Sequence, residues 1–193
     1  MDESRFLALV RRNRVNAAIL DRLGDIGLTD PWLVSGALFQ TVWNVLTERP
    51  PTHGILDYDV FYFDDTDLSW EAEDAWIKAV DGAFSDLGVK VELRNQARVH
   101  LWYPSKFGAP YPAMSDAKQS IDHFLAKACM VGLSPGEANA PILYAPAGLT
   151  DIENLTIRPN YTSNFQPIRY REKAERWRRD WPELTIIDPV AAT

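Results

Sequence analysis

The segment Ile55–Phe63 constrains the fold more than any other part of the chain. Its residues are aromatic, aliphatic or acidic, a composition that predicts a β-strand bounded by loops. Side chains alternate between the two faces of a strand, so Asp57 and Asp59 would share one face while Tyr58 and Val60 point to the other. Since both faces are mostly apolar, we expect a central strand that is covered on both sides.

The two aspartates would lie close enough to share one cation. Alternate residues on a strand face are about 7 Å apart at Cα, and two carboxylates about 4 Å apart repel by roughly 4 kcal/mol at an effective dielectric constant of 20. A divalent cation bound between Asp57 and Asp59 would remove that repulsion. In the alternative interpretation, Asp57 caps the preceding loop and Asp59 pairs with an arginine.

A glycine turn precedes this strand. The short apolar run Trp32–Val34 ends at Ser35-Gly36, and residues 37–47 have helical composition. Free backbone N–H groups and the helix dipole at such an N-terminus suit a phosphate. Ser35, Gly36 and Ala37 are therefore predicted to contact the phosphates of a nucleotide whose metal ions lie at the acidic strand.

Several blocks of the sequence together resemble a family of small bacterial nucleotidyltransferase-like proteins, within the polymerase-beta-type nucleotidyltransferase superfamily. The blocks cover roughly residues 30–182 and comprise Gly36–Leu38, Thr41–Asn44, Asp57–Asp64, Leu68–Asp74, Asn95–Trp102 and Trp177–Pro182. The resemblance implies transfer of a nucleoside monophosphate from a nucleoside triphosphate to an unknown acceptor hydroxyl. It also implies two Mg²⁺ ions, with Mn²⁺ as a substitute.

The resemblance further implies roles for individual residues. Gly36 would be the turn glycine, Asp57 and Asp59 metal ligands, and Asn44 a nucleotide-binding residue. The superfamily has a third carboxylate on a neighbouring strand, and Glu92 is our candidate for it. These three acids form the predicted catalytic and metal site.

A further strand is expected over residues 97–103. Alternation there places Gln96, Arg98, His100 and Trp102 on one face. In the functional interpretation, Arg98 neutralises a phosphate of the nucleotide. In the alternative interpretation, this face is simply exposed to solvent.

Charge and composition exclude several classes of protein. The net charge is −7, from 20 Lys and Arg against 27 Asp and Glu, which argues against nucleic-acid binding over the whole surface. One cysteine, Cys129, leaves no intrachain disulfide and no zinc cage of thiolates. There is no apolar run of membrane-spanning length and no secretory leader, so we expect a cytoplasmic protein with no membrane partner.

The order of elements favours an α+β (mixed α/β) fold, with a nucleotidyltransferase-like mixed sheet flanked by helices in a single domain over residues 1–193. A covering helix is expected over about residues 4–23 and a basic helix over about 170–181, which either faces solvent or contacts a triphosphate or nucleic-acid acceptor. Helices are also expected from Ser69 to about Leu87 and over 115–131. Strands are expected over 89–93 and 142–144, and a turn with a short helix over 148–155.

Two other functions compete with nucleotidyl transfer. Residues 60–67 also resemble the strand of haloacid-dehalogenase-type phosphatases, with Asp65 as nucleophile and Asp67 as acid. Alternatively, the fold binds a nucleotide or a partner without catalysis. The second alternative rests on Ala37, which stands where the superfamily usually has Ser or Gly.

Overall fold

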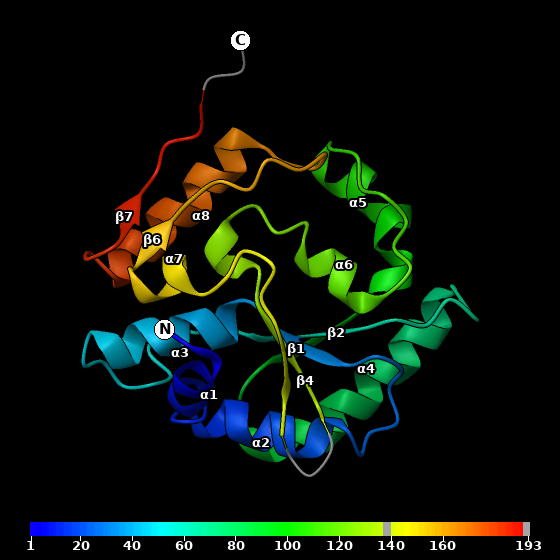
Figure 1. Cartoon of the computed structure of the whole chain (residues 1–193). Coiled ribbons are helices and arrows are strands. Elements are labelled where there is room, and N and C mark those ends of the chain that lie inside the picture. Colours follow the sequence, from blue (N-terminus) through cyan, green and yellow to red (C-terminus); the bar gives the residue numbers. More distant parts are fainter. Residues whose placement is uncertain (137–139, 191–193) are drawn as a thin grey trace.

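The computed structural model describes residues 1–136 and 140–190, and a mixed sheet of five strands lies at its centre (Figure 1). The order across this sheet is β3-β2-β1-β4-β5, where β2 and β3 are parallel and the other pairs are antiparallel. The strands are β1 (Trp32–Val34), β2 (Tyr58–Tyr62), β3 (Val91–Asn95), β4 (Gly132–Ser134) and β5 (Ile142–Tyr144). The predicted mixed sheet flanked by helices is confirmed.

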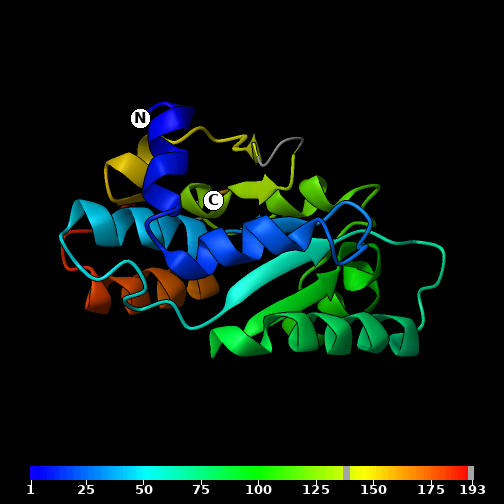
Figure 2. The same ribbon diagram turned by 90° about the horizontal axis from the view of Figure 1, so that it is seen from below.

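Helices cover both faces of the sheet: α2 and α4 lie on one side, and α5, α6 and α8 on the other (Figures 1 and 2). A parallel pair of short strands, β6 (Thr156–Ile157) and β7 (Thr185–Ile186), lies beside α8. The helices are α1 (Glu3–Val10), α2 (Arg14–Leu23), α3 (Gly36–Leu46), α4 (Trp70–Phe84), α5 (Val99–Phe107), α6 (Ala117–Ile121), α7 (Thr150–Glu153) and α8 (Pro167–Asp180). Among the described residues, no helix is both long and apolar enough to span a bilayer.

Strand β2 has neighbours on both edges, as its sequence predicts. Tyr58, Val60 and Tyr62 are buried in the main hydrophobic core, whereas Asp59 and Phe61 point to the other face and are partly exposed. The strand is shorter than expected, so Asp57 lies in the loop directly before it. The alternation of side chains nevertheless keeps the acidic residues on the side of the sheet that faces α8.

The predicted helix over residues 4–23 is wrong in one respect: it is two helices, α1 and α2. Asn13 breaks it, because this residue has extended backbone angles and its side chain accepts a hydrogen bond from Val15 N. The Asn13 amide also donates to Thr41 Oγ1 (3.0 Å) and to Tyr58 Oη (3.1 Å) inside the core. These buried hydrogen bonds outweigh the helical periodicity at that point.

The predicted strand over residues 97–103 is also wrong. After β3 the chain forms a short 3₁₀ turn (Gln96–Arg98) and then α5. The side chain of Asn95 caps this turn by accepting from Ala97 N (3.1 Å). Because a helical turn separates side chains by about 100° rather than 180°, Gln96, Arg98, His100 and Trp102 do not form the expected common face.

The predicted helix over residues 115–131 is limited to α6, and Asp116, rather than Ser115, caps it. Further along that segment, backbone groups form hydrogen bonds with residues distant in sequence. Lys127 N donates to Arg158 O (2.9 Å), and Val131 O accepts from Ser35 N (2.8 Å). These long-range backbone bonds compete successfully with the local helical preference.

The loop before β2 is fixed to the end of α8. The indole of Trp181 is fully buried, and its Nε1 donates to Asn44 Oδ1 (2.8 Å). Gly54 lies against the same ring with a φ of +69°, and a Cβ at this position would be 2.7 Å from Trp181 Cη2. The glycine is therefore required both for its backbone angle and for its close approach to the ring.

We predict that Gly54→Ala lowers the free energy of unfolding by about 1–3 kcal/mol, because it combines a strained φ with overlap in a rigid core. The control is Gly82→Ala in α4, where an added Cβ meets nothing within 4 Å. That change should raise stability by about 0.4–1 kcal/mol. Urea unfolding measures both. Equal stability of the two variants would contradict the packing described for Trp181.

Candidate active site

A cleft of about 580 Å³ lies between β2, the start of α3 and α8. One wall carries the acids and the other carries cations. The lining residues are Ser35, Gly36, Gln40, Gly54, Leu56, Asp57, Asp59, Phe124, Lys173, Arg176, Trp177, Arg179 and Asp180. The structure thus brings Asp57, Asp59, Ser35 and Gly36 together, as the sequence predicts.

The carboxylates of Asp57 and Asp59 have no hydrogen-bond or ion-pair partner within residues 1–136 and 140–190. The alternative in which Asp57 caps a loop and Asp59 pairs with an arginine is therefore not what the structure shows. Burial, followed by the charges of Asp57 and Glu92, raises the pKa of Asp59 to about 7, although Lys173 and Arg94 oppose this shift. A bound cation would stabilise the ionised form of this buried carboxylate.

Glu92 lies directly beside Asp59, because the two residues are register partners in the parallel pair β2–β3. Its carboxylate is occupied, since Lys90 donates to one oxygen and Arg94 Nη2 donates to the other (2.8 Å). Burial raises the pKa of Glu92, but the Lys90 hydrogen bond and the Arg94 charge outweigh it, and the pKa falls below its usual value. Glu92 is thus an ionised carboxylate beside the aspartate pair.

In the described part of the chain, no group of three or more His, Cys, Asp or Glu side chains is arranged to hold a metal ion. Asp57 and Asp59 line the cleft, Glu92 does not, and the role of the three acids as metal ligands stays a prediction. Rotation of Glu92 away from Lys90 and Arg94 would be needed for it to join the aspartates. Two free carboxylates on one cleft wall fit a divalent cation with oxygen ligands.

The turn before α3 is strained at Ser35 rather than at Gly36. Ser35 has φ 55° and ψ −115°, an uncommon region for a residue with a side chain. Its N–H bonds to Val131 O, and its carbonyl accepts from Leu38 N and Phe39 N. Within the described residues, the N–H groups of Gly36 and Ala37 have no acceptor, and of these two residues Gly36 lines the cleft.

Gln40 is a site residue that the sequence interpretation missed. It follows Gly36 by one helical turn, and a Cβ on Gly36 would be 3.0 Å from Gln40 Nε2. Its side chain is 7% exposed, and Oε1 has no hydrogen-bond partner in the described structure. The spacing of four residues on one helix face was the signal that could have identified it.

Helix α8 supplies the opposite wall. Lys173, Arg176 and Arg179 line the cleft, and no ion pair involves them among the described residues. Trp177 lies between them, buried, and its Nε1 also has no partner there. These three cations are exposed at the cleft, so contact of the basic helix with an anion stays a prediction beside the solvated alternative.

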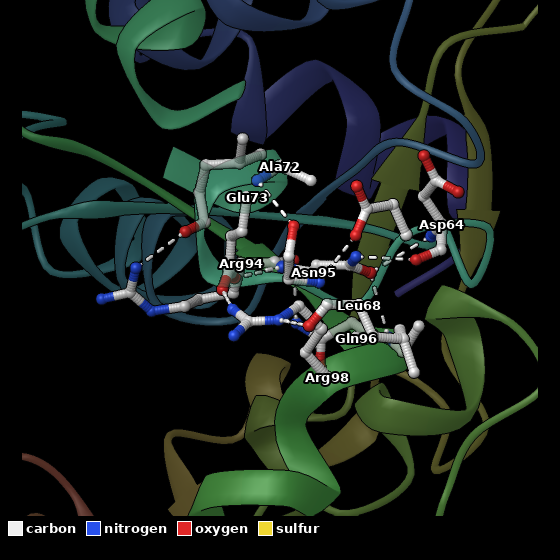
Figure 3. Close-up of polar contacts among 12 residues, drawn as sticks. Asp64, Leu68, Ala72, Glu73, Arg94, Asn95, Gln96 and Arg98 are labelled. Carbon is white, nitrogen blue, oxygen red and sulfur yellow. Dashed lines mark hydrogen bonds and ion pairs between the residues drawn. The ribbon is translucent and has the colours of Figure 1, made fainter. Parts of the chain in front are cut away.

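Arg98 and Asn44 lie outside this cleft. Figure 3 shows Arg98 paired with Glu73, whose side chain is 2% exposed and also accepts from Asn95 N (2.8 Å). The Arg98 Nε donates to Leu68 O (2.8 Å), so two contacts, with Glu73 and with Leu68, hold the guanidinium away from the aspartates. This arrangement does not place Arg98 on a phosphate, in contrast to the prediction.

Asn44 is fully buried, and its side chain forms hydrogen bonds with the backbone of the loop before β2 rather than facing the cleft. Its amide donates to Pro51 O (3.2 Å) and His53 O (2.8 Å), and its oxygen accepts from Trp181. Ala37 is also fully buried and, unlike Ser35 and Gly36, does not line the cleft. The predicted role of Asn44 as a direct nucleotide contact therefore has no geometric support.

The acids of the competing phosphatase interpretation are elsewhere. Asp65 and Asp67 are exposed in the loop after β2, and Asp67 Oδ1 accepts from Ser69 N (2.9 Å) just before α4. Ser69 in turn caps α4 by accepting from Ala72 N. Asp67 and Ser69 thus organise the start of α4, as polar residues near a helix N-terminus commonly do.

A family model described as nucleotidyltransferase matches residues 21–186. The chain belongs to this nucleotidyltransferase family. A structure solved by NMR, described as revealing a CCA-adding enzyme head domain, is 25% identical in sequence with a TM-score of 0.80, and the match covers 97% of each chain. The comparison with curated proteins gave no match. The expected family, fold and enzyme class are confirmed, and the phosphatase alternative is not supported.

We predict that Asp59→Asn makes the metal-free nucleotidyltransferase more stable at about pH 8, by up to about 4 kcal/mol. A raised pKa means that the folded state resists ionisation, so this penalty is complete above about pH 7 and disappears as the pH falls toward 4. Urea unfolding across this range measures it. Asp81→Asn, an exposed change on α4, should show no such pH dependence. If the gain in unfolding free energy of Asp59→Asn over the wild type were larger at pH 5 than at pH 8, the raised pKa of Asp59 would be contradicted.

We predict that Arg98→Ala lowers the free energy of unfolding by about 3–5 kcal/mol, because it leaves the carboxylate of Glu73 buried without its partner. The control is Arg178→Ala, which removes an exposed pair with Glu175 and should cost at most about 1 kcal/mol. Thermal and urea unfolding measure the two effects. A change in triphosphate affinity without loss of stability in Arg98→Ala would restore the original phosphate-binding prediction.

Proposed function

We propose that this nucleotidyltransferase binds a nucleoside triphosphate with Mg²⁺ in the cleft and transfers the nucleoside monophosphate to an acceptor hydroxyl. The observation that carries the proposal is the pair of carboxylates, Asp57 and Asp59, which have no partner in the described part of the chain and lie between a helix N-terminus and a row of cations. On the sequence grounds given above, we place this reaction in the bacterial cytoplasm.

The acids would hold the metal. Asp57 and Asp59 are the first ligands, and Glu92 is the third once its side chain leaves Lys90 and Arg94. Bound Mg²⁺, replaceable by Mn²⁺, supplies charge neutralisation and stabilises the attacking and leaving oxygens. While Glu92 contacts Lys90 and Arg94, the hydrogen bond and charges of these two residues hold its pKa below the usual value.

The phosphates would lie between α3 and α8. The N–H of Gly36 has no acceptor among the described residues and would bind a phosphate at the N-terminus of α3, and Gln40 Nε2 lies near Gly36. Lys173 and Arg176 face them from α8 and bring the positive charge that a triphosphate needs. The protein's own contribution is to orient the phosphates and to counter their charge.

A crystal grown with Mn²⁺ and a non-hydrolysable nucleoside triphosphate tests this assignment. Anomalous scattering should place manganese within bonding distance of Asp57 and Asp59, with Glu92 turned toward the metal. Manganese bound elsewhere would refute the site. Tight binding together with no pyrophosphate release across a broad acceptor screen would favour the alternative of a nucleotide-binding protein without catalysis.

We predict that Lys173→Ala weakens binding of magnesium and a non-hydrolysable triphosphate about 10- to 100-fold, because a charge-assisted contact with phosphate is lost. Arg178→Ala is the matched control, since Arg178 lies on the same helix but outside the cleft. Isothermal titration calorimetry measures both dissociation constants. Equal affinities for the two variants would contradict a triphosphate site against α8.

A further inference from the structure

A second cavity, lined mainly by aromatic rings, lies beside the catalytic cleft. Its volume is about 180 Å³, and a cavity of about 150 Å³ is known to hold one benzene ring. Phe61 and Phe124 are stacked on one side, and Tyr103 is 4.6 Å from both Phe107 and Tyr111, centroid to centroid. The space suits one planar ring system rather than a whole nucleotide.

The aromatic cavity lies next to the cleft, on the side toward the C-terminal ends of β2 and β3. Phe124 and Lys173 line both spaces. Phe61 follows Asp59 by two residues on the same face of β2, and Arg94 follows Glu92 by two on β3. Ser35-Gly36 lies at the opposite end of β2, because β1 and β2 are antiparallel with Trp32 opposite Phe61. The acids thus lie between the phosphate site and the aromatic cavity.

The charged groups around the cavity are cations. Arg94, Arg169 and Lys173 line it, together with His123, and no Asp or Glu of the described residues does. The Arg169 guanidinium lies 4.1 Å from the Phe107 ring centroid. Ser120, a buried polar residue, also lines the cavity. In nucleotide-binding proteins, aromatic rings stack on the base and cations contact the phosphate of the same nucleotide.

The geometry of nucleotidyl transfer indicates whether this cavity binds the triphosphate or the acceptor. In an in-line displacement, the attacking and leaving oxygens lie on opposite sides of the reacting phosphorus. If pyrophosphate leaves toward Gly36 and α8, the attacking hydroxyl approaches from the side of β3 and α5. In Figure 1, α5 and α6 lie to the right, whereas α3, the helix that begins at Gly36, lies to the left. The aromatic cavity is therefore on the acceptor side.

We propose that the aromatic cavity binds the base of an acceptor nucleotide, so that a ribose hydroxyl of this nucleotide faces the catalytic acids. This inference rests on the function proposed above. The hydroxyl oxygen forms a bond to the α-phosphorus of the triphosphate, the bond from that phosphorus to the bridging oxygen breaks, and pyrophosphate leaves. The hydroxyl proton passes to solvent. The acceptor is either a free nucleotide or the end of a single strand, and both present the same base and phosphate.

The test titrates adenosine, guanosine, cytidine and uridine 5′-monophosphates into the full chain saturated with Mg²⁺ and a non-hydrolysable triphosphate. At least one should bind while the triphosphate stays bound. Tyr103→Leu should weaken this binding about tenfold or more, as expected for a lost base stack, and Tyr103→Phe should keep it within about threefold. Tyr161→Leu is the control, since Tyr161 is exposed and outside the cavity. A short oligoribonucleotide ending in the preferred base forms a second arm.

The outcomes separate the possibilities. Tighter binding of the oligoribonucleotide than of the monophosphate assigns the acceptor to a strand end, and equal binding assigns it to a free nucleotide; both support the inference. If no monophosphate binds the saturated protein, or if Tyr103→Leu weakens the triphosphate instead, the cavity does not hold an acceptor base and the inference is overturned. If the wild-type protein does not bind the non-hydrolysable triphosphate at all, the proposed function itself is refuted. Circular dichroism verifies that Tyr103→Leu is folded, and Tyr103→Phe provides the ring-retaining variant.

Discussion

The site depends on like charges that are forced together by apolar packing. Tyr58, Val60 and Tyr62 anchor one face of β2 in the core, and strand alternation then fixes Asp59 on the other face, beside Asp57 and next to Glu92. The fold tolerates the resulting repulsion because the hydrophobic face of the strand contributes far more free energy than the acids lose. The repulsion makes the cleft receptive to a cation.

The cations opposite these acids are positioned by aromatic rings rather than by ion pairs. Trp177 lies edge-on to Phe39 and Trp43, at centroid distances of 5.3 and 6.2 Å, and thereby fixes α8 against α3. Lys173 and Arg176 remain free to face the cleft because the apolar side of their helix does the docking. Positive and negative walls can thus be held apart at a fixed spacing without neutralising each other.

The sequence predicted the parts of the site that depend on local pattern. Strand β2, the turn at Ser35-Gly36 and the acids at 57, 59 and 92 follow from alternation, turn chemistry and the family resemblance. The errors at Asn13, Arg98 and Asn44 have a common physical cause. Each of these polar side chains satisfies buried partners distant in sequence, Tyr58, Glu73 and Trp181 respectively, and no local pattern contains that information. Gln40 and the aromatic cavity were missed because tertiary packing alone brings their neighbours together.

The parallel pairing of β2 with β3 restricts how sequences of this kind can diverge. Helix α4 connects the two strands, so its length determines which residue of β3 lies opposite Asp59. A single-residue insertion or deletion there that shifted the register would exchange Glu92 for an apolar neighbour, Val91 or Leu93, and would turn the carboxylate toward the core. Substitutions on the exposed side of α4 carry no such consequence. Relatives that keep the chemistry should therefore vary in the composition of this connecting helix far more than in its length.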